Sequence, residues 1–265
     1  MIQNRRAVLV LLAFICLAAG TNDRPNTPVA PQPNTLSAQE KQDGWILLWD
    51  GKTTAGWRSA FGEEFPEKSW VITNGEFSVL STGNTESQVG GDIITRERFS
   101  DFELMVDFKI TTNCNSGIKY FVHPDVSPVT GSGVKMAKGS AIGYEFQILD
   151  DERHPDAKLG RNGNRRLGAL YDLMPASSDK KVNPIGEWNT AHIIVHGNHA
   201  EHWLNGEKIL EYDRTTPEFK QAFAHSKFKK IPDFPTWNEG HILLQEHGST
   251  AYFRNIKIRL LMAEK

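Results

Sequence analysis

The stretch GYEFQILDDERHPDA, residues 143–157, contains the alternation on which the fold prediction depends. Its apolar positions 144, 146 and 148 would point to one face of a β-strand, while Glu145 and Gln147 would point to the other. The strand pattern then breaks into a cluster of charges around His154. We therefore expect one face of this strand to pack in a core. The other face is either simply hydrated or the floor of a functional site.

The same two-residue period recurs along the chain, most clearly in DFELMVDFKI at 101–110. Many short strand patterns and few helical ones predict an all-β fold, a sandwich of antiparallel sheets. We expect the segment 240–261 to form a hairpin. The tight-turn signals between strands are Asn74-Gly75, Gly197-Asn198, Asn205-Gly206 and Gly248-Ser249.

Two segments have helical character. Residues 215–230 offer Thr215 or Thr216 as an N-cap and Pro217 in the first turn, with Phe219 on the apolar face. A second, short helix is expected within 36–44.

The N-terminus has the pattern of a secretory signal peptide, with a basic start before an apolar run at 7–20. That run is shorter than the roughly 20 residues that span a bilayer. Cys16 offers the alternative of a lipid anchor, although Phe14 and Ile15 suit lipid attachment poorly. We expect export to the periplasm or cell surface, with no membrane contact other than that anchor. The predicted organisation is a signal peptide at 1–20, a proline-rich tether and short helix at 21–42, and one catalytic domain at 43–265.

Composition narrows the classes of partner. The chain is 39% hydrophobic with a formal net charge of -2, so no excess of basic residues points to nucleic acid. Without the leader, Cys114 is the only cysteine, which excludes an internal disulfide. A buried thiol is favoured over a nucleophile at this position.

No phosphate-binding glycine loop, HExxH or Gly-x-Ser-x-Gly motif is present in the sequence. The polar faces of the predicted strands instead carry carboxylate, carboxamide and imidazole groups. We expect five of them to share a shallow concave groove, namely Glu145, Gln147, His202, Gln245 and His247.

Seven motifs, in order along the chain, resemble the 3-keto-disaccharide hydrolase family, also described as 3-keto-glucoside 1,2-lyase / 3-keto-2-hydroxy-glucal hydratase. The resemblance runs from about residue 45 to 261. The motifs are WILLWDGKTTAGW (45–57), DFELMVDFKI (101–110), NSGIKYFV (115–122), GYEFQILDD (143–151), LGALYDLMP (167–175), GEWNTAHIIVHGNHAEHWLNG (186–206) and GHILLQEHG with YFRNIKIR (240–259).

This resemblance implies a concanavalin A-like jelly-roll, a sandwich of two curved antiparallel sheets with a carbohydrate groove. It also implies a substrate oxidised to a ketone at C3 by a separate sugar 3-dehydrogenase. The ketone acidifies the C2 proton, and a base that removes it leaves an enolate. The enolate expels the C1 substituent, and water then adds to the 2-hydroxy-glucal, which completes a net hydrolysis.

The strand pattern and the resemblance together suggest catalytic roles. Glu145 would be the base or a metal ligand, and Lys119 would stabilise the developing oxyanion. His154, in the loop after the strand, would be an acid or base near neutral pH. His202 would approach the same face from another strand.

No cofactor follows from the sequence with certainty, but a divalent cation is an open alternative. Its ligands would be Glu145, His202 and His247, because carboxylate and imidazole suit such cations. A bound cation would stabilise the enolate as a Lewis acid.

Further residues are candidates for sugar contacts. Gln147 would bind sugar hydroxyls, and Tyr171 could stack on a ring. Arg254 could equally anchor the sheet through an ion pair. The full set is Gln147, Asn115, Tyr171, Gln245, His247 and Arg254.

Two other functions fit the same architecture. A lectin-like module would capture sugars without catalysis, but Glu and His together in the groove favour an enzyme. A retaining glycosidase needs two carboxyl groups about 5–5.5 Å apart, whereas the strand offers Glu145 and Gln147. Asp150 would lie on the opposite face of a regular strand.

Overall fold

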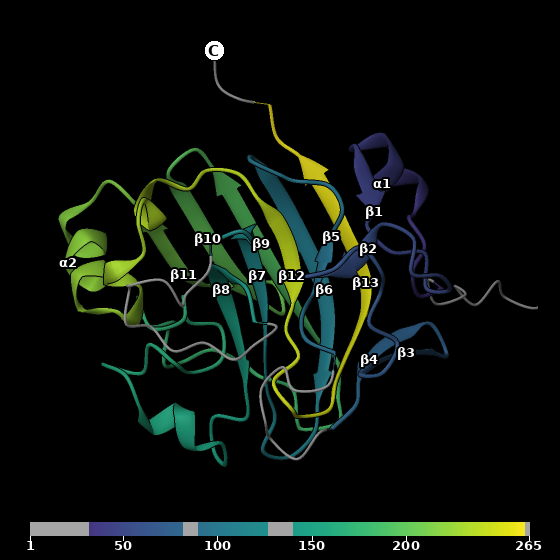
Figure 1. Ribbon diagram of the computed structural model, residues 1–265, viewed down its shortest axis with the longest axis horizontal. Coiled ribbons are helices and arrows are strands. Elements are labelled where there is room, and N and C mark those ends of the chain that lie inside the picture. The colour runs from purple at the N-terminus through teal and green to yellow at the C-terminus, as the bar shows by residue number, and fades with distance from the viewer. Residues whose placement is uncertain (1–31, 82–89, 127–139, 263–265) are drawn as a thin grey trace, which may run out of the picture. The chain divides into compact units, whose positions relative to one another are not determined.

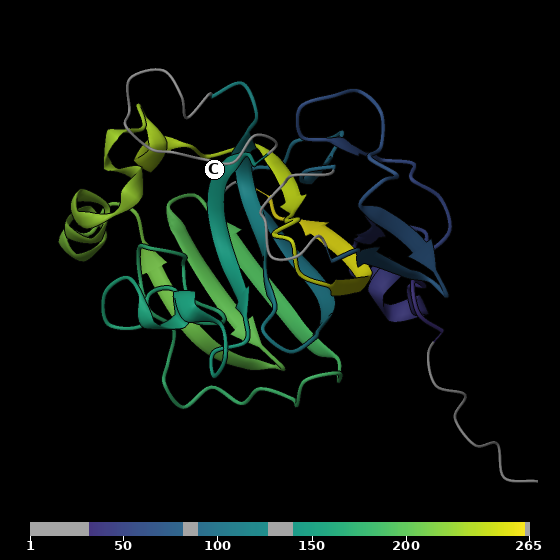
Figure 2. The same cartoon turned by 60° about the horizontal axis from the view of Figure 1, so that its bottom comes forward.

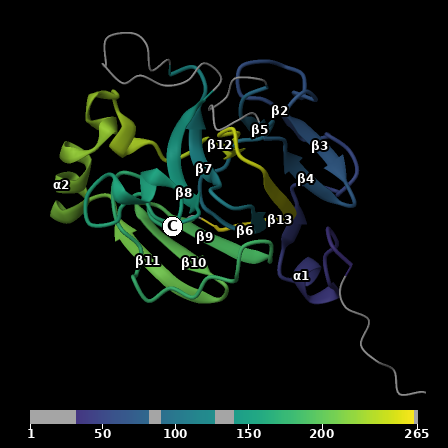
Figure 3. The same cartoon turned by 90° about the horizontal axis from the view of Figure 1, so that it is seen from below.

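The computed structural model describes residues 32–81, 90–126 and 140–262. The predicted signal peptide and most of the predicted tether lie outside these residues. The described residues form two antiparallel sheets (Figure 1) that pack face to face as two layers (Figure 3). The predicted all-β sandwich is therefore confirmed.

The larger sheet has eight strands in the order β11-β10-β9-β6-β13-β4-β3, with β1 also paired to β13. Its strands are β1 (Trp45–Leu47), β3 (Trp70–Thr73), β4 (Glu76–Val79), β6 (Phe102–Ile110), β9 (Asn189–His196), β10 (His199–Leu204), β11 (Glu207–Asp213) and β13 (Ala251–Leu260). The smaller sheet has the order β2-β5-β12-β7-β8. Its strands are β2 (Trp57–Ser59), β5 (Ile93–Thr95), β7 (Asn115–His123), β8 (Ile142–Leu149) and β12 (His241–Leu244).

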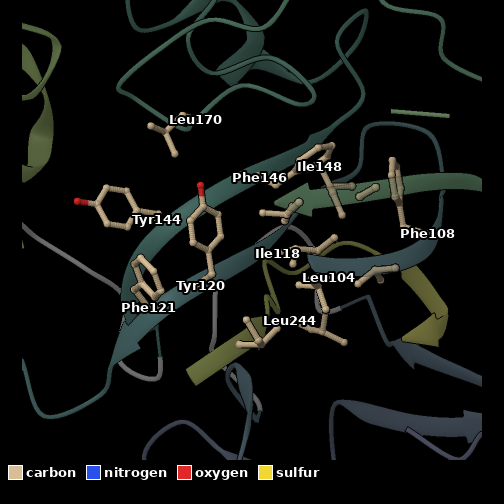
Figure 4. Close-up of a cluster of buried hydrophobic side chains, with 14 of the residues drawn as sticks. Leu104, Phe108, Ile118, Tyr120, Phe121, Tyr144, Phe146, Ile148, Leu170 and Leu244 are labelled. Carbon is tan, nitrogen blue, oxygen red and sulfur yellow. The ribbon is translucent and has the colours of Figure 1, made fainter. Parts of the chain in front are cut away.

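The core lies between the two sheets. β6 buries every second residue, as its sequence predicts, and β8 contributes Tyr144, Phe146 and Ile148. Figure 4 shows side chains of β8 pointing toward Leu104 of the larger sheet. β8 differs from β6 because all of its positions are buried, including those that face away from the core. Loops therefore cover the outer face of the smaller sheet, which carries Glu145.

The turns and helices follow local sequence signals. Asn74 and Gly75 both have positive φ, at 54° and 73°, as the type I′ turn between β3 and β4 requires. α1 (Ala38–Gln42) begins with a capping box at Ser37. α2 (Pro217–His225) begins after Thr216, whose hydroxyl accepts from the Phe219 amide at 3.3 Å. Both helix predictions are confirmed.

Three short 3₁₀ turns complete the described structure. They are η1 (Pro155–Lys158), η2 (Lys227–Lys230) and η3 (Phe234–Thr236). Of the helices in the described part of the chain, none has the length and apolar content that a membrane span needs.

The predicted hairpin across Gly248-Ser249 is wrong. β12 pairs with β5 and β7 in the smaller sheet, whereas β13 pairs with β1, β4 and β6 in the larger sheet. The connection after β12 therefore crosses between the layers. The sequence signal predicts a chain reversal but does not specify the strand to which the next segment bonds.

His202 lies in the core, so its predicted place on the polar face is wrong. Its Nδ1 donates to the Gly168 carbonyl at 2.9 Å, and its Nε2 accepts from the Tyr120 hydroxyl at 3.0 Å. The Tyr120 hydroxyl lies 2.5 Å from that of Tyr212. The His202 ring also packs 4.9 Å from the ring of Phe146, on the core face of β8. Because Glu145 points to the other face of that strand, His202 cannot act with it as an acid, base or metal ligand.

This burial predicts an acid-sensitive contribution to stability. Burial lowers the pKa of His202 to about 4, below the value of about 6.5 expected in the unfolded chain. The unfolded chain therefore takes up the proton first as the pH falls. Neutral His202 therefore makes its full contribution to the free energy of unfolding above about pH 6.5. Between about pH 6.5 and pH 4 this contribution is lost progressively, by about 3 kcal/mol in total.

We expect His202→Gln to lower the free energy of unfolding at neutral pH. The difference from wild type should shrink as the pH falls through this window, measured by urea unfolding at a series of pH values. His225→Gln, which changes an exposed histidine, is the control. A difference that stays constant with pH would contradict the argument.

Candidate active site

The outer face of the smaller sheet brings a carboxylate and an amine together. Lys119 on β7 lies directly opposite Glu145 on β8, and Gly117 lies opposite Gln147. Directly opposed side chains on one face of a sheet are neighbours. Lys119 is 4% exposed and Glu145 5%, so this face is enclosed rather than the shallow groove that the sequence predicts.

Lys119 is held by groups from outside its own strand. Its Nζ donates to the Ala141 carbonyl at 3.1 Å and lies 3.7 Å from Asp92 Oδ2. Asp92 is fully buried and also accepts from the backbone amides of Ala141 and Glu246. A buried cation needs such a counter-charge to remain charged. Sequence reasoning missed Asp92, although an acid placed directly before an apolar strand is an available signal.

The Glu145 carboxylate lies over a glycine on the neighbouring strand. A Cβ atom at Gly117 would come within 2.4 Å of Glu145 Oε1. The Gln147 carboxamide nitrogen can turn to donate to the same oxygen, Glu145 Oε1, at 3.1 Å and to the Ser116 carbonyl at 3.0 Å. Gly117 and Gln147 thus fix the position of the carboxylate.

We expect Gly117→Ala to lower kcat by about 100-fold, because the new methyl group pushes the Glu145 carboxylate out of place. The stability of the fold should change little, since the displaced atom is the free end of a side chain. Steady-state kinetics measures the change in kcat, and thermal unfolding measures the change in stability. Gly62→Ala is the matched control, because its Cβ would make only an ordinary 3.6 Å contact with Ser59. Full activity of Gly117→Ala would refute this role for the glycine.

Two histidines lie at the other end of this face. The Asn115 side-chain nitrogen lies 3.4 Å from His247 Nε2, and a terminal atom of Gln147 lies 3.4 Å from Asn115 Oδ1. The rings of His247 and His154 are 6.3 Å apart. Residues from β7, β8 and two loops thus form one continuous polar cluster.

The hydrogen bonding of His154 defines its tautomer. The Asp156 amide donates to His154 Nδ1 at 3.2 Å, so Nδ1 carries no proton. Burial and the nearby His247 lower the pKa of His154, against the opposing charges of Asp156 and Asp150. The ring is therefore neutral near pH 7 with its proton on Nε2, and it offers a hydrogen-bond donor rather than a base.

Tyr171 is tied to β8 through its backbone, since its amide donates to the Glu145 carbonyl at 3.0 Å. Burial, followed by the carboxylates of Asp156 and Glu145, raises the pKa of its phenol, while the Arg165 guanidinium opposes this. The phenol therefore keeps its proton at neutral pH. The Arg165 guanidinium lies 5.4 Å from the Tyr171 ring and 3.0 Å from Asp156 Oδ1.

Gln245 follows β12 and is anchored to β7 by its backbone. Its amide donates to the Gly117 carbonyl at 3.0 Å, and its carbonyl accepts from the Ser116 hydroxyl at 2.8 Å. The residue is buried beside the cluster.

Comparison with known proteins identifies the family of this chain. A family model described as a 3-keto-alpha-glucoside-1,2-lyase-like domain matches residues 44–259. A 3-keto-disaccharide hydrolase of Bacteroides thetaiotaomicron is 35% identical over 244 residues, which are 88% of this chain and 83% of that protein. The chain belongs to the 3-keto-disaccharide hydrolase family.

Solved structures support the fold of this family member. A candidate glycosyl hydrolase from Parabacteroides distasonis has 29% identity and a TM-score of 0.72, and the match covers 87% of this chain and all of that one. A second such protein from the same organism has 28% identity and a TM-score of 0.61, with 82% and 99% of the two chains covered. The predicted jelly-roll is confirmed.

The structure of this family member does not bring Arg254 to the cluster. Arg254 lies on β13 of the larger sheet, where its Nε is 3.5 Å from Asp107 Oδ2. Its guanidinium lies 4.0 Å from the Trp188 ring centroid. The predicted sugar contact at Arg254 is wrong, and the alternative of an ion pair within the sheet is confirmed.

The predicted metal ligands do not converge, because His202 lies across the sheet from Glu145 and His247. Among residues 32–81, 90–126 and 140–262, one group of three side chains could share an ion, formed by His199, Glu201 and Glu211. Lys208 forms ion pairs with both of these carboxylates. This geometry does not fit the predicted site, so we derive no chemical step through a metal.

Cys114 is buried, and its surroundings raise the pKa of its thiol to about 12, mainly through desolvation. The thiol is therefore protonated at neutral pH and packs in the core, as the sequence favours.

Proposed function

We propose that this chain cleaves 3-keto-glycosides by removal of the C2 proton and elimination of the C1 substituent, followed by hydration of the 2-hydroxy-glucal. The name of the Bacteroides thetaiotaomicron relative, a 3-keto-disaccharide hydrolase, supports this substrate class. The observation that carries the proposal is the enclosed pair of Glu145 and Lys119 on opposed strands. An elimination next to a ketone needs a base, and it needs a cation or hydrogen-bond donors at the oxyanion.

Glu145 is the base in this mechanism. Its carboxylate lies over Gly117 and can accept from the Gln147 carboxamide, so it stays in place while it takes the C2 proton. The oxyanion develops at the C3 oxygen. Lys119 stabilises this charge. The Nε2 proton of neutral His154, at the other end of the face, is a donor to hydroxyls of the sugar.

Tyr171 supplies the proton for the departing oxygen at C1. Its raised pKa keeps the phenol protonated, and the backbone hydrogen bond of Tyr171 to Glu145 supports this role. Asn115, Gln147, Gln245 and His247 supply the polar surface that holds sugar hydroxyls.

Turnover in deuterated water tests this proposal. We expect purified protein to act on 3-keto-trehalose or a 3-keto-β-glucoside, with deuterium incorporated at C2 and a transient enone that absorbs ultraviolet light. Glucoside cleavage without deuterium at C2 would instead indicate direct hydrolysis by a glycosidase mechanism. Sugar binding without any turnover would indicate the lectin-like alternative. Loss of activity in EDTA would indicate that a divalent cation takes part in the reaction.

The biological setting is part of the same proposal. A sugar 3-dehydrogenase supplies the keto substrate, because this chemistry cannot begin on an unoxidised glycoside. The N-terminal segment directs export to the periplasm or cell surface. Mass spectrometry of the secreted protein would locate the cleavage site, and an intact N-terminus retained in the cytoplasm would refute export.

A further inference from the structure

A basic cleft of about 910 Å³ lies beside the candidate active site, between the 160–175 segment and the helical region that begins with α2. In Figure 2, α2 (yellow-green) and η1 (green-teal) both lie toward the left of the view. Polar and basic side chains line much of the cleft, among them Arg161, Asn164, Arg165, Lys227, Lys229 and Lys230.

The charge of this cleft is opposite to that of the whole chain. Five Lys and Arg residues line it against two carboxylates, Asp172 and Glu218, whereas the chain has a net charge of -2. Asp172 is already occupied, since it accepts from Arg165 Nε and from the Lys227 amide, both at 2.7 Å. The other four cations, Arg161, Lys227, Lys229 and Lys230, are exposed. Such a concentration of positive charge in a concave surface attracts anions.

The cleft shares a wall with the active site. Tyr171, whose amide bonds to the Glu145 carbonyl, has its ring 4.3 Å from Lys227 Nζ and 5.4 Å from the Arg165 guanidinium. Arg165 and Lys227 both line the cleft. A glycoside whose C1 oxygen lies at the Tyr171 phenol can therefore extend its leaving group toward these cations.

We propose that this cleft binds the leaving group and selects leaving groups that carry an anionic substituent such as a carboxylate. This inference rests on the function proposed above. The recognition is electrostatic, through side chains of the 160–175 segment and of η2, so the preference weakens as salt concentration rises. The neutral sugar that undergoes elimination remains on the outer face of the smaller sheet.

Two matched substrates test the cleft, the 4-carboxyphenyl and 4-carbamoylphenyl 3-keto-glucosides. They differ in charge but have nearly the same shape. We expect kcat/KM to be about tenfold higher for the carboxylate in low salt. The double variant Lys229→Glu with Lys230→Glu should abolish or invert this ratio. Lys41→Glu with Lys52→Glu makes the same change in net charge at exposed positions elsewhere and should leave the ratio unchanged.

The outcomes separate the two proposals. Equal kcat/KM for both substrates, or an unchanged ratio in the Lys229 and Lys230 variant, would overturn the role of the cleft while leaving the elimination in place. Failure to turn over either 3-keto compound would overturn the proposed function, and with it the role of the cleft. Thermal unfolding of each variant confirms that the change in ratio arises in a folded protein.

Discussion

Glu145→Gln should lower kcat by about 1,000-fold, because a carboxamide cannot accept the C2 proton. The substitution keeps the size of the side chain, and its carbonyl oxygen can still accept from Gln147. We therefore expect the free energy of unfolding to change little. Deuterium exchange at C2 of the bound 3-keto substrate should disappear together with turnover, which assigns the loss to proton abstraction.

Glu187→Gln, in an exposed loop position, is the control for the loss of one negative charge. A Glu145→Gln variant that keeps more than about a tenth of wild-type kcat would require another base. His154 is the neighbour to test next, although its Nδ1 is occupied by the Asp156 amide.

Lys119→Met should lower kcat by about 100- to 1,000-fold, because it removes the cation that stabilises the enolate. It also leaves Asp92 without the ammonium group at 3.7 Å in a buried position. Breaking a buried ion pair in this way destabilises a fold by about 3 kcal/mol. Loss of activity in this variant alone could thus reflect unfolding.

The double variant Asp92→Asn with Lys119→Met separates catalysis from stability. Neutral groups at both positions should recover part of the lost free energy of unfolding, measured by urea denaturation, because no lone charge remains buried. Activity should not recover with it. A folded double variant with near wild-type kcat would exclude Lys119 from the chemistry.

The strands, turns and helices could be predicted from local sequence patterns, because interactions between residues close in sequence determine them. The alternation around Glu145 and Gln147 defines which side chains of β8 enter the core, and it holds in the structure. Asn-Gly turns and the Thr216 cap are likewise local events. The outer face of β8, the antiparallel sandwich and the two helices could therefore be predicted from sequence alone.

The partners of these elements could not be predicted in the same way. Alternation shows on which face of its strand a side chain lies, but it does not show which sheet the strand joins. His202 shares its face of β10 with Ala200 and Leu204, which are apolar core residues. These apolar neighbours predict burial for His202, whereas the polar character of histidine predicts exposure, and the structure follows the neighbours.

By itself, the sequence determined the strand pattern, the family and the position of Glu145 on a polar face. The tertiary structure alone decided that Asp92 pairs with Lys119 and that the Tyr171 amide bonds to the Glu145 carbonyl of β8. It also decided that β12 and β13 lie in different sheets. These contacts join residues distant in sequence. Their energies depend on burial and on the opposing group, and neither is encoded in the local pattern of either partner.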